Sequence, residues 1–388
     1  MSVQTNITLK DLFTAEAPLI TSTLIIFLIA FLVELFYYLY FFIQAGKEKP
    51  KKRVKKDSLP PVSVIICARN EEGNLKKNLP RILSQNYPYY EVIVVDDCSD
   101  DNTNTLLMDF KLKHPNFKFT AIKGDTKFTH NKKLALTIGI KAASNEHLLF
   151  TDADCYPASN RWIREMMINY TRKTEIVLGY GGYEMRSGFL NKIIRYETIF
   201  TAMQYMGFAE RKIPYMGVGR NLSYTKSLFF KNKGFASHTH LDSGDDDLFI
   251  SETANAINTV VETNPDSFTR SIPENNLKDW FRQRKRHFTT GFRYKPRIKL
   301  LLSLEYFARM FFYLSFLFLL FEVTLYQFIL IIFVINLIIK GIILKIILRR
   351  LNEAFLFIFS LIIEPFIPFV YILIHFINFV ESKKNRWR

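Results

Sequence analysis

The sequence predicts an α/β domain, with a mostly parallel sheet flanked by helices, joined to transmembrane helices. Three observations lead to this prediction. Short apolar runs alternate with helical patterns in the first half of the chain, as in parallel sheets covered on both faces. Apolar residues concentrate in Leu19–Ile43 and Tyr306–Val380, and about 20 such residues can cross a bilayer as a helix. Basic clusters border these apolar blocks, as expected beside the cytoplasmic ends of membrane spans.

Each strand of the predicted sheet is a short apolar run bounded by polar residues. The predicted strands are Val62–Cys67, Glu91–Val95, Lys118–Ile122 and His147–Thr151, with helices through Leu75–Leu83 and Lys132–Ala143. The second half is less regular. There we expect helices at Trp162–Thr171, Leu190–Phe208 and Asp246–Thr253, and strands at Val177–Tyr183 and Thr259–Glu262. Polar residues follow three of the early strands, where ligands of parallel sheets bind.

The chain divides into four predicted parts. Residues 1–45 form a short tail and the first span, residues 46–60 a basic linker, residues 61–300 the α/β domain and residues 301–388 a membrane region. About three C-terminal spans or re-entrant segments are expected, near 306–322, 325–344 and 356–380. The last one contains Glu364, Pro365 and Pro368, so we expect it to be broken or re-entrant.

Much of the formal net charge of +16 is local and lies in basic clusters beside the apolar runs. Lys47–Lys56 holds seven basic residues directly after the first apolar run, which places the α/β domain on the cytoplasmic face of the cell membrane. The chain is thus predicted to be a multi-pass protein with the lipid bilayer as partner. Because the basic clusters lie at membrane edges, no nucleic acid partner is expected. Four complete spans would put the basic segment Lys383–Arg388 on the side of the membrane opposite the α/β domain, against the tendency of basic residues to lie on the cytoplasmic side. A re-entrant last segment removes this conflict.

The pair Asp152 and Asp154 is the strongest chemical signal. Both follow a predicted buried strand, two residues apart, so their carboxylates can converge on one point. Two such carboxylates repel each other unless a hard cation such as Mg²⁺ or Mn²⁺ lies between them. That ion can also hold the two phosphates of a nucleotide diphosphate. A polar loop is the ordinary alternative.

Three further polar segments stand out. Asp96–Asp100 ends another strand of the same sheet, and is either a ligand site or a helix cap. Gly244–Asp247 holds consecutive acids, one of which could act as a general base or favour a helix start. Trp280–His287 is basic and aromatic. It suits either a diphosphate leaving group or a membrane interface.

Taken in order, these motifs resemble the membrane-bound, inverting family 2 glycosyltransferases. Lys132–Leu136 resembles the family's Lys-x-x-Ala-Leu-Asn helix, with Thr137 in the place of Asn, and Gly217–Asn221 resembles the loop before the acceptor site. Gln283–His287 resembles Gln-x-x-Arg-Trp, with His287 in the Trp position. In the family this motif is associated with processive polymerases. The resemblance covers about residues 61–290 and implies a GT-A fold.

The resemblance implies a nucleotide-sugar donor, most commonly a UDP-sugar in this family, and a lipid-linked or glycan acceptor. It also implies roles for individual residues. The donor side consists of Arg69, Asn70, Glu71, Asp97, Lys132 and Asp152, and the metal ligands are Asp152 and Asp154. The acceptor side consists of Gly219, Asn221 and Asp245. The catalytic residues are Asp246, as the base, with Gln283 and Arg286 beside the leaving diphosphate.

Several alternatives remain open at this stage. His238 and His240 lie near the predicted base in the sequence, and either could be a third metal ligand. A processive polysaccharide synthase competes with a non-processive transferase in cell-envelope polysaccharide or glycolipid synthesis, and the His287 departure favours the latter. A catalytically dead nucleotide-binding membrane scaffold is the alternative of another class.

Overall fold

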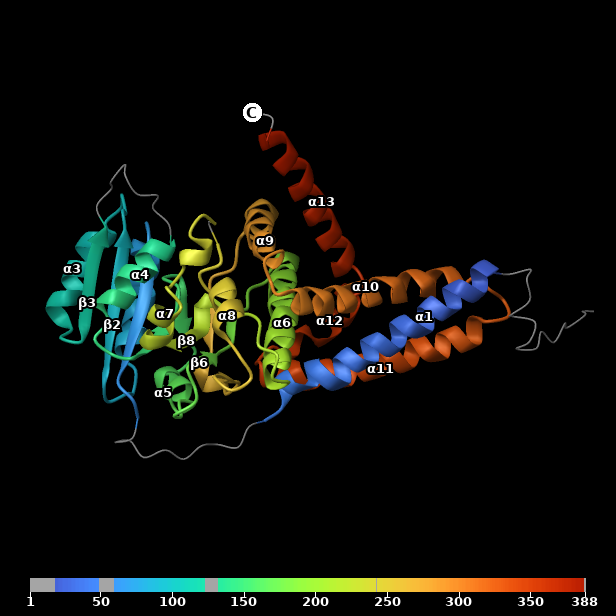
Figure 1. Ribbon diagram of the computed structural model, residues 1–388, viewed down its shortest axis with the longest axis horizontal. Coiled ribbons are helices and arrows are strands. Elements are labelled where there is room, and N and C mark those ends of the chain that lie inside the picture. The colour runs from blue at the N-terminus through green and yellow to red at the C-terminus, as the bar shows by residue number, and fades with distance from the viewer. Residues whose placement is uncertain (1–17, 49–58, 123–131, 242, 387–388) are drawn as a thin grey trace, which may run out of the picture.

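The computed structural model describes residues 18–48, 59–122, 132–241 and 243–386. An α/β body lies at one end of the molecule and a bundle of long helices extends from it (Figure 1). The basic cluster Lys47–Lys56 lies mostly outside the described residues.

The main sheet has the strand order β3-β2-β1-β4-β8-β6-β9. Neighbours from β3 to β4 run parallel, whereas β8 is antiparallel to both β4 and β6. The predicted α/β class with a mostly parallel sheet is therefore confirmed. The strands are β1 Val62–Ala68, β2 Tyr90–Asp97, β3 Phe117–Ile122, β4 His147–Phe150, β6 Ile176–Leu178, β8 Leu222–Thr225 and β9 Thr259–Val261.

A second, three-stranded sheet has the order β5-β10-β7 and comprises β5 Cys155–Pro157, β10 Thr269–Ser271 and β7 Gly181–Tyr183. The prediction of one strand over Val177–Tyr183 was wrong, because this segment is divided between β6 of the main sheet and β7 of the small one. Between them the Gly179 carbonyl accepts a hydrogen bond from the Tyr205 hydroxyl, so the ladder of the main sheet ends there.

Helices cover both faces of the main sheet, and alternate residues of its strands face opposite cores. Ile65 and Leu148 belong to one buried cluster, and Val64 and Leu149 to the other. Helix α5 ends before the predicted Thr171, because the Asn169 side chain bonds back to the last turn and to Glu262. The helices of the α/β body are α2 Glu72–Leu83, α3 Thr103–Lys113, α4 Lys132–Ala142, α5 Trp162–Met167, α6 Phe189–Glu210, α7 Lys226–Lys231, α8 Asp247–Thr253 and α9 Leu277–Gly291.

Within the part of the chain that the structure describes, three helices are long and apolar enough to cross a membrane. They are the continuous helix Pro18–Gly46, which includes α1 Pro18–Phe36, together with α10 Pro296–Leu319 and α11 Tyr326–Arg350. They pack side by side as the bundle of Figure 1. Helix α10 begins before the predicted span at 306, so the predicted domain boundary at residue 300 falls inside this helix.

The last apolar segment is bent, as its sequence predicts. Helices α12 Phe357–Ile363 and α13 Ile367–Arg386 are separated by a break that contains Pro365, and the segments Ala354–Ile363 and Ile367–Ile374 meet at 69°. Proline removes a helical hydrogen bond and favours such a break. Helix α13 then leaves the bundle on the side of the α/β body (Figure 1).

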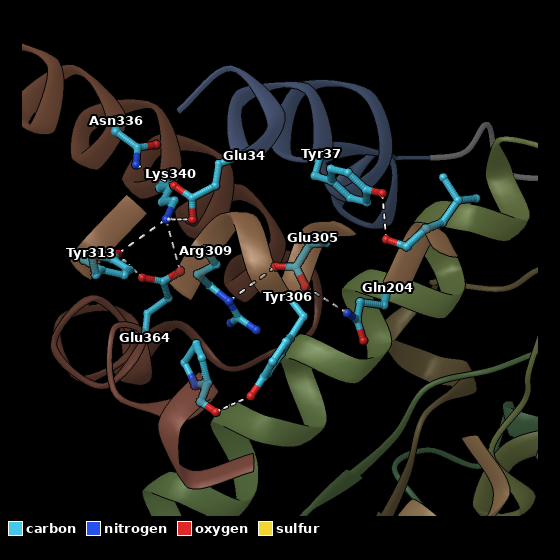
Figure 2. A network of polar contacts seen from close by, with 12 residues as sticks. Glu34, Tyr37, Gln204, Glu305, Tyr306, Arg309, Tyr313, Asn336, Lys340 and Glu364 are labelled. Carbon is cyan, nitrogen blue, oxygen red and sulfur yellow. Dashed lines mark hydrogen bonds and ion pairs between the residues drawn. The ribbon is translucent and has the colours of Figure 1, made fainter. Parts of the chain in front are cut away.

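A buried ionic network explains the charged residues inside the apolar segments (Figure 2). The Lys340 ammonium lies 2.7 Å from a carboxylate oxygen of Glu34 and 3.1 Å from one of Glu364. Asn336 donates to Glu34 at 2.8 Å, and the Tyr313 hydroxyl donates to Glu364. Ionisable side chains in such segments are costly unless they pair with one another, and here they connect α1, α10, α11 and the bend before α13.

Two contacts fix the α/β body on the long apolar helices. Glu353, which follows α11, is buried and pairs with Arg195 of α6 and Arg270 of β10. Gly207 of α6 packs so closely on the helix Pro18–Gly46 that a Cβ there would lie 2.5 Å from the Phe41 carbonyl oxygen. The orientation of the body relative to the bundle is therefore set by buried contacts.

Candidate active site

Acidic side chains converge beyond the carboxyl end of β4. A ligand oxygen of Asp152, one of Asp154 and the Cys155 sulfur all lie within 4.8 Å of one another. The Lys132 ammonium, at the start of α4, lies 2.7 Å from an Asp152 oxygen and 3.2 Å from an Asp245 oxygen. Lysine thus links the predicted metal site to the predicted acceptor side.

The two aspartates differ in their electrostatic environment. Burial, followed by the nearby Asp152 charge, raises the pKa of Asp154. Burial also acts to raise the pKa of Asp152, but the Lys132 ammonium, which both attracts and hydrogen-bonds the carboxylate, together with the charges of Arg220 and Arg286 lowers that pKa. A divalent cation between the carboxylates would remove their repulsion, and hard ions such as Mg²⁺ and Mn²⁺ prefer such oxygen ligands. The residues present therefore fit a divalent ion.

Asp246 is held by backbone amides at the start of α8. One carboxylate oxygen accepts from the Gly219 amide and the other from the Asp247 amide, both at 2.7 Å. Burial, followed by the charges of Asp245 and Asp247, raises the pKa of Asp246 to about 7. A carboxylate with this pKa can take up a proton near neutral pH, as a general base must.

The predicted nucleotide-binding residues lie on neighbouring loops at the same sheet edge. The Asn70 amide donates to the Ser99 hydroxyl at 2.9 Å, and the Asn70 side chain accepts from the Asp100 amide at 2.7 Å. Asn70 has a φ of 57°, a conformation that asparagine tolerates better than most residues. The loops after β1 and β2 are thereby joined.

The predicted donor residues around this junction differ in exposure. Arg69 is exposed, Glu71 is half-buried and Asp97 is buried at the end of β2. Burial raises the pKa of Glu71, and Asp154 and Asp152 raise it further. The loop after β1 is therefore close enough to the two aspartates to share their electrostatic field.

The loop before β8 supplies a cation that was not among the predicted site residues. The backbone carbonyl of Arg220 accepts from the hydroxyls of Thr151 and Thr269 at 3.0 and 2.8 Å, and the guanidinium lies 4.3 Å from the centre of the Tyr183 ring. Its charge affects the pKa of both Asp152 and Asp154. The position of Arg220 within the Gly217–Asn221 motif is the sequence feature from which it could have been predicted.

Asn221 itself is fully buried beneath the site. Its side chain accepts from the Trp162 indole at 3.0 Å and donates to the carbonyls of Tyr180 and Ser267. These bonds fix the conformation of the loop that contains Gly219 and Asn221. Gly219, in contrast, faces Asp246, where an added Cβ would lie 3.3 Å from a carboxylate oxygen.

One cavity of about 1000 Å³ contains most of the candidate residues. It is lined by Lys132, Asp152, Asp154, Gly219, Asp245, Asp246, Gln283 and Arg286, and it continues to α10 and α13. The side chain of His287 is outside the described part. His238 is buried and lies 3.4 Å from Glu252, and His240 contacts Arg293. Among the described residues neither histidine belongs to the cluster at Asp152 and Asp154.

Comparisons with known proteins agree with this geometry. The profile of Glycosyl transferase family 2 matches residues 63–230. A poly-beta-1,6-N-acetyl-D-glucosamine synthase of Staphylococcus epidermidis is 38% identical over 120 residues, which cover 30% of this chain and 27% of the relative. Glycosyltransferase AglE of Haloferax volcanii is 36% identical over 108 residues, covering 27% and 34%. The matches thus span about a quarter to a third of these relatives.

The fold has a counterpart among solved structures. The mannosyltransferase PcManGT from Pyrobaculum calidifontis, in complex with GDP-Man and Mn²⁺, matches with a TM-score of 0.54 at 18% identity, covering 89% of this chain and 99% of that chain. The α/β body thus has the GT-A fold of nucleotide-sugar transferases. Residues 63–230 thus match a family 2 glycosyltransferase domain, which confirms the resemblance drawn from the motifs.

Proposed function

We propose that the protein transfers a sugar, with inversion, from a nucleotide-diphosphate sugar to an acceptor at the cytoplasmic face of the cell membrane, in cell-envelope polysaccharide or glycolipid synthesis. The observation that carries the proposal is the position of Asp246. It lines the same cavity as Asp152 and Asp154, and its pKa of about 7 suits a general base.

The donor's nucleotide would lie over the loops after β1 and β2, against Asp97 and the segment from Arg69 to Glu71. Asp152 and Asp154 would hold Mg²⁺ or Mn²⁺, which when bound neutralises charge on the diphosphate. Asp246 would take the proton from the acceptor hydroxyl as its oxygen attacks the anomeric carbon.

Arginines that line the cavity would stabilise the leaving diphosphate. Arg220 and Arg286 both line it, and both act electrostatically on Asp152. Arginine donates in a planar fork that suits phosphate oxygens. Gln283, one helical turn before Arg286, lines the same wall.

A UDP-sugar is the proposed donor. UDP-N-acetylglucosamine is the first candidate, because a relative matched at 38% identity over 120 residues is named for a polymer of that sugar. UDP-glucose and GDP-mannose complete a panel that tests both the sugar and the base.

The test is release of nucleoside diphosphate by the purified, full-length protein in detergent with Mn²⁺. The proposal expects release from one member of the panel, its loss with a chelator, and its loss in Asp246→Asn. No release from any donor, in a protein that unfolds cooperatively, would favour a catalytically dead nucleotide-binding scaffold.

A further inference from the structure

The cavity that holds Asp246 has a second, apolar end. There it is lined by Leu302 and Phe307 of α10 and by Ile372 and Phe376 of α13. Helix α10 is apolar enough to cross a membrane, and the last three of these side chains are exposed. The Tyr306 hydroxyl donates to the Pro368 carbonyl and joins the two helices. An apolar chain can therefore extend from the cavity toward the bilayer between α10 and α13.

Two arginines also line the cavity, and each is already paired with a carboxylate. Arg284 of α9 lies 3.4 Å from a Glu197 oxygen, and Arg309 of α10 lies 3.4 Å from a Glu305 oxygen. Figure 2 shows the second pair, in which both side chains are almost completely buried.

This pairing disfavours an anionic headgroup beside the two arginines. A phosphate there would meet the carboxylates of Glu197 and Glu305 as well as the arginines, and burying one more negative charge in this region is costly. Lys299 also lines the cavity, but its side chain is exposed and donates to the Phe292 carbonyl at 3.4 Å.

The same region offers hydrogen-bond donors that nothing in the described part of the chain satisfies. The Arg284 Nε, the Arg309 Nη1 and the Tyr180 hydroxyl are buried and have no partner among the described residues. All three side chains line the cavity. Buried polar groups are nearly always hydrogen-bonded in native proteins, and the hydroxyl oxygens of a neutral ligand would accept from these donors without adding charge.

We propose that the cavity binds a lipid acceptor whose headgroup is uncharged and carries hydroxyls, such as a glycosylated diacylglycerol, with its chains leaving between α10 and α13. The inference rests on the proposed function and narrows its acceptor. In the reaction, a headgroup hydroxyl oxygen forms a bond to the anomeric carbon, the bond from that carbon to the diphosphate oxygen breaks with its electron pair, and the proton passes to Asp246.

In the first experiment the full-length protein is reconstituted in phosphatidylcholine vesicles. It is then given the donor that it hydrolyses, in radiolabelled form. Separate vesicles contain monoglucosyl diacylglycerol or a polyprenyl phosphate, and a third arm adds a soluble oligosaccharide. We expect the neutral glycolipid to be labelled at least about tenfold faster than the polyprenyl phosphate.

The results separate this inference from the proposed function. Preferred labelling of the polyprenyl phosphate or of the oligosaccharide would overturn the neutral-lipid assignment. Donor hydrolysis without labelling of any lipid would overturn it too, while leaving the transferase proposal intact. A protein that neither hydrolyses nor transfers any donor would refute both.

Matched variants test the route between α10 and α13. Ile372 lines the cavity, whereas its neighbour Leu373 is exposed on α13 and is not among the lining residues described. Ile372→Trp should lower the ratio of lipid transfer to donor hydrolysis at least about tenfold, and Leu373→Trp should leave this ratio unchanged. Equal ratios in the two variants would show that the acceptor does not pass this opening.

Discussion

Replacing Asp246 with asparagine is expected to lower turnover by about 10²- to 10⁴-fold, because an amide cannot take the acceptor's proton. Donor affinity should stay unchanged, since the proposed nucleotide and metal contacts belong to other residues. The substitution is nearly isosteric, and the amide oxygen can still accept from one of the two backbone amides that hold Asp246. An equal loss of donor binding and turnover would contradict the assigned role.

The pH dependence of kcat/KM tests the role of Asp246 as base in a second way. With a pKa of about 7, about a tenth of Asp246 is ionised at pH 6 and about nine tenths at pH 8. A base must be ionised to act, so kcat/KM should rise about tenfold between these values. An aspartate with its ordinary pKa would be ionised throughout this range.

Asp245 offers a way to move this profile. Its charge is the second cause, after burial, of the raised pKa of Asp246, so Asp245→Asn should shift the rise in kcat/KM to lower pH. The assay follows labelled-sugar transfer between pH 5.5 and 9, with thermal unfolding at each pH as control. A flat wild-type profile, or a variant profile shifted toward higher pH, would refute the reasoning.

Three further predictions concern the metal site and the fold. Asp154→Ala should abolish Mn²⁺-dependent donor binding in calorimetry, and unchanged affinity would refute the metal site. Gly207→Ala should destabilise the protein by about 1–3 kcal/mol, because its Cβ would meet backbone 2.5 Å away, whereas a Cβ at Gly73 meets nothing within 4 Å; equal melting temperatures for the two alanine variants would contradict this. Glu353→Gln should cost about 3–5 kcal/mol in denaturant unfolding by leaving two arginines without their buried partner, and a loss below about 1 kcal/mol would argue against the junction.

The parallel strands and the acidic ends of β2 and β4 could be predicted from the sequence because their signals are local. Apolar runs mark buried strands, and the topology of parallel sheets brings their carboxyl ends together. The break in the last apolar segment was predictable for the same reason, since Pro365 acts on its own helix.

Features that depend on long-range contacts could not be predicted. The division of Val177–Tyr183 between two sheets depends on packing against α6. The cavity beyond Asp246 combines Glu197, Arg284 and Arg309 from three helices, and their individual patterns are those of ordinary surface or membrane helices. Glu34 is a charged residue within an apolar run, and its partner Lys340 lies 306 residues away in the sequence.

The most direct test of the central claim is nucleoside-diphosphate release from the nucleotide-sugar panel by the wild-type protein and Asp154→Ala, with and without Mn²⁺. The wild type is expected to release UDP from one UDP-sugar only when the metal is present, and Asp154→Ala is expected to release none under either condition. Equal release by the two proteins, or release by the wild type that a chelator does not reduce, would contradict a metal-dependent transferase centred on Asp152 and Asp154.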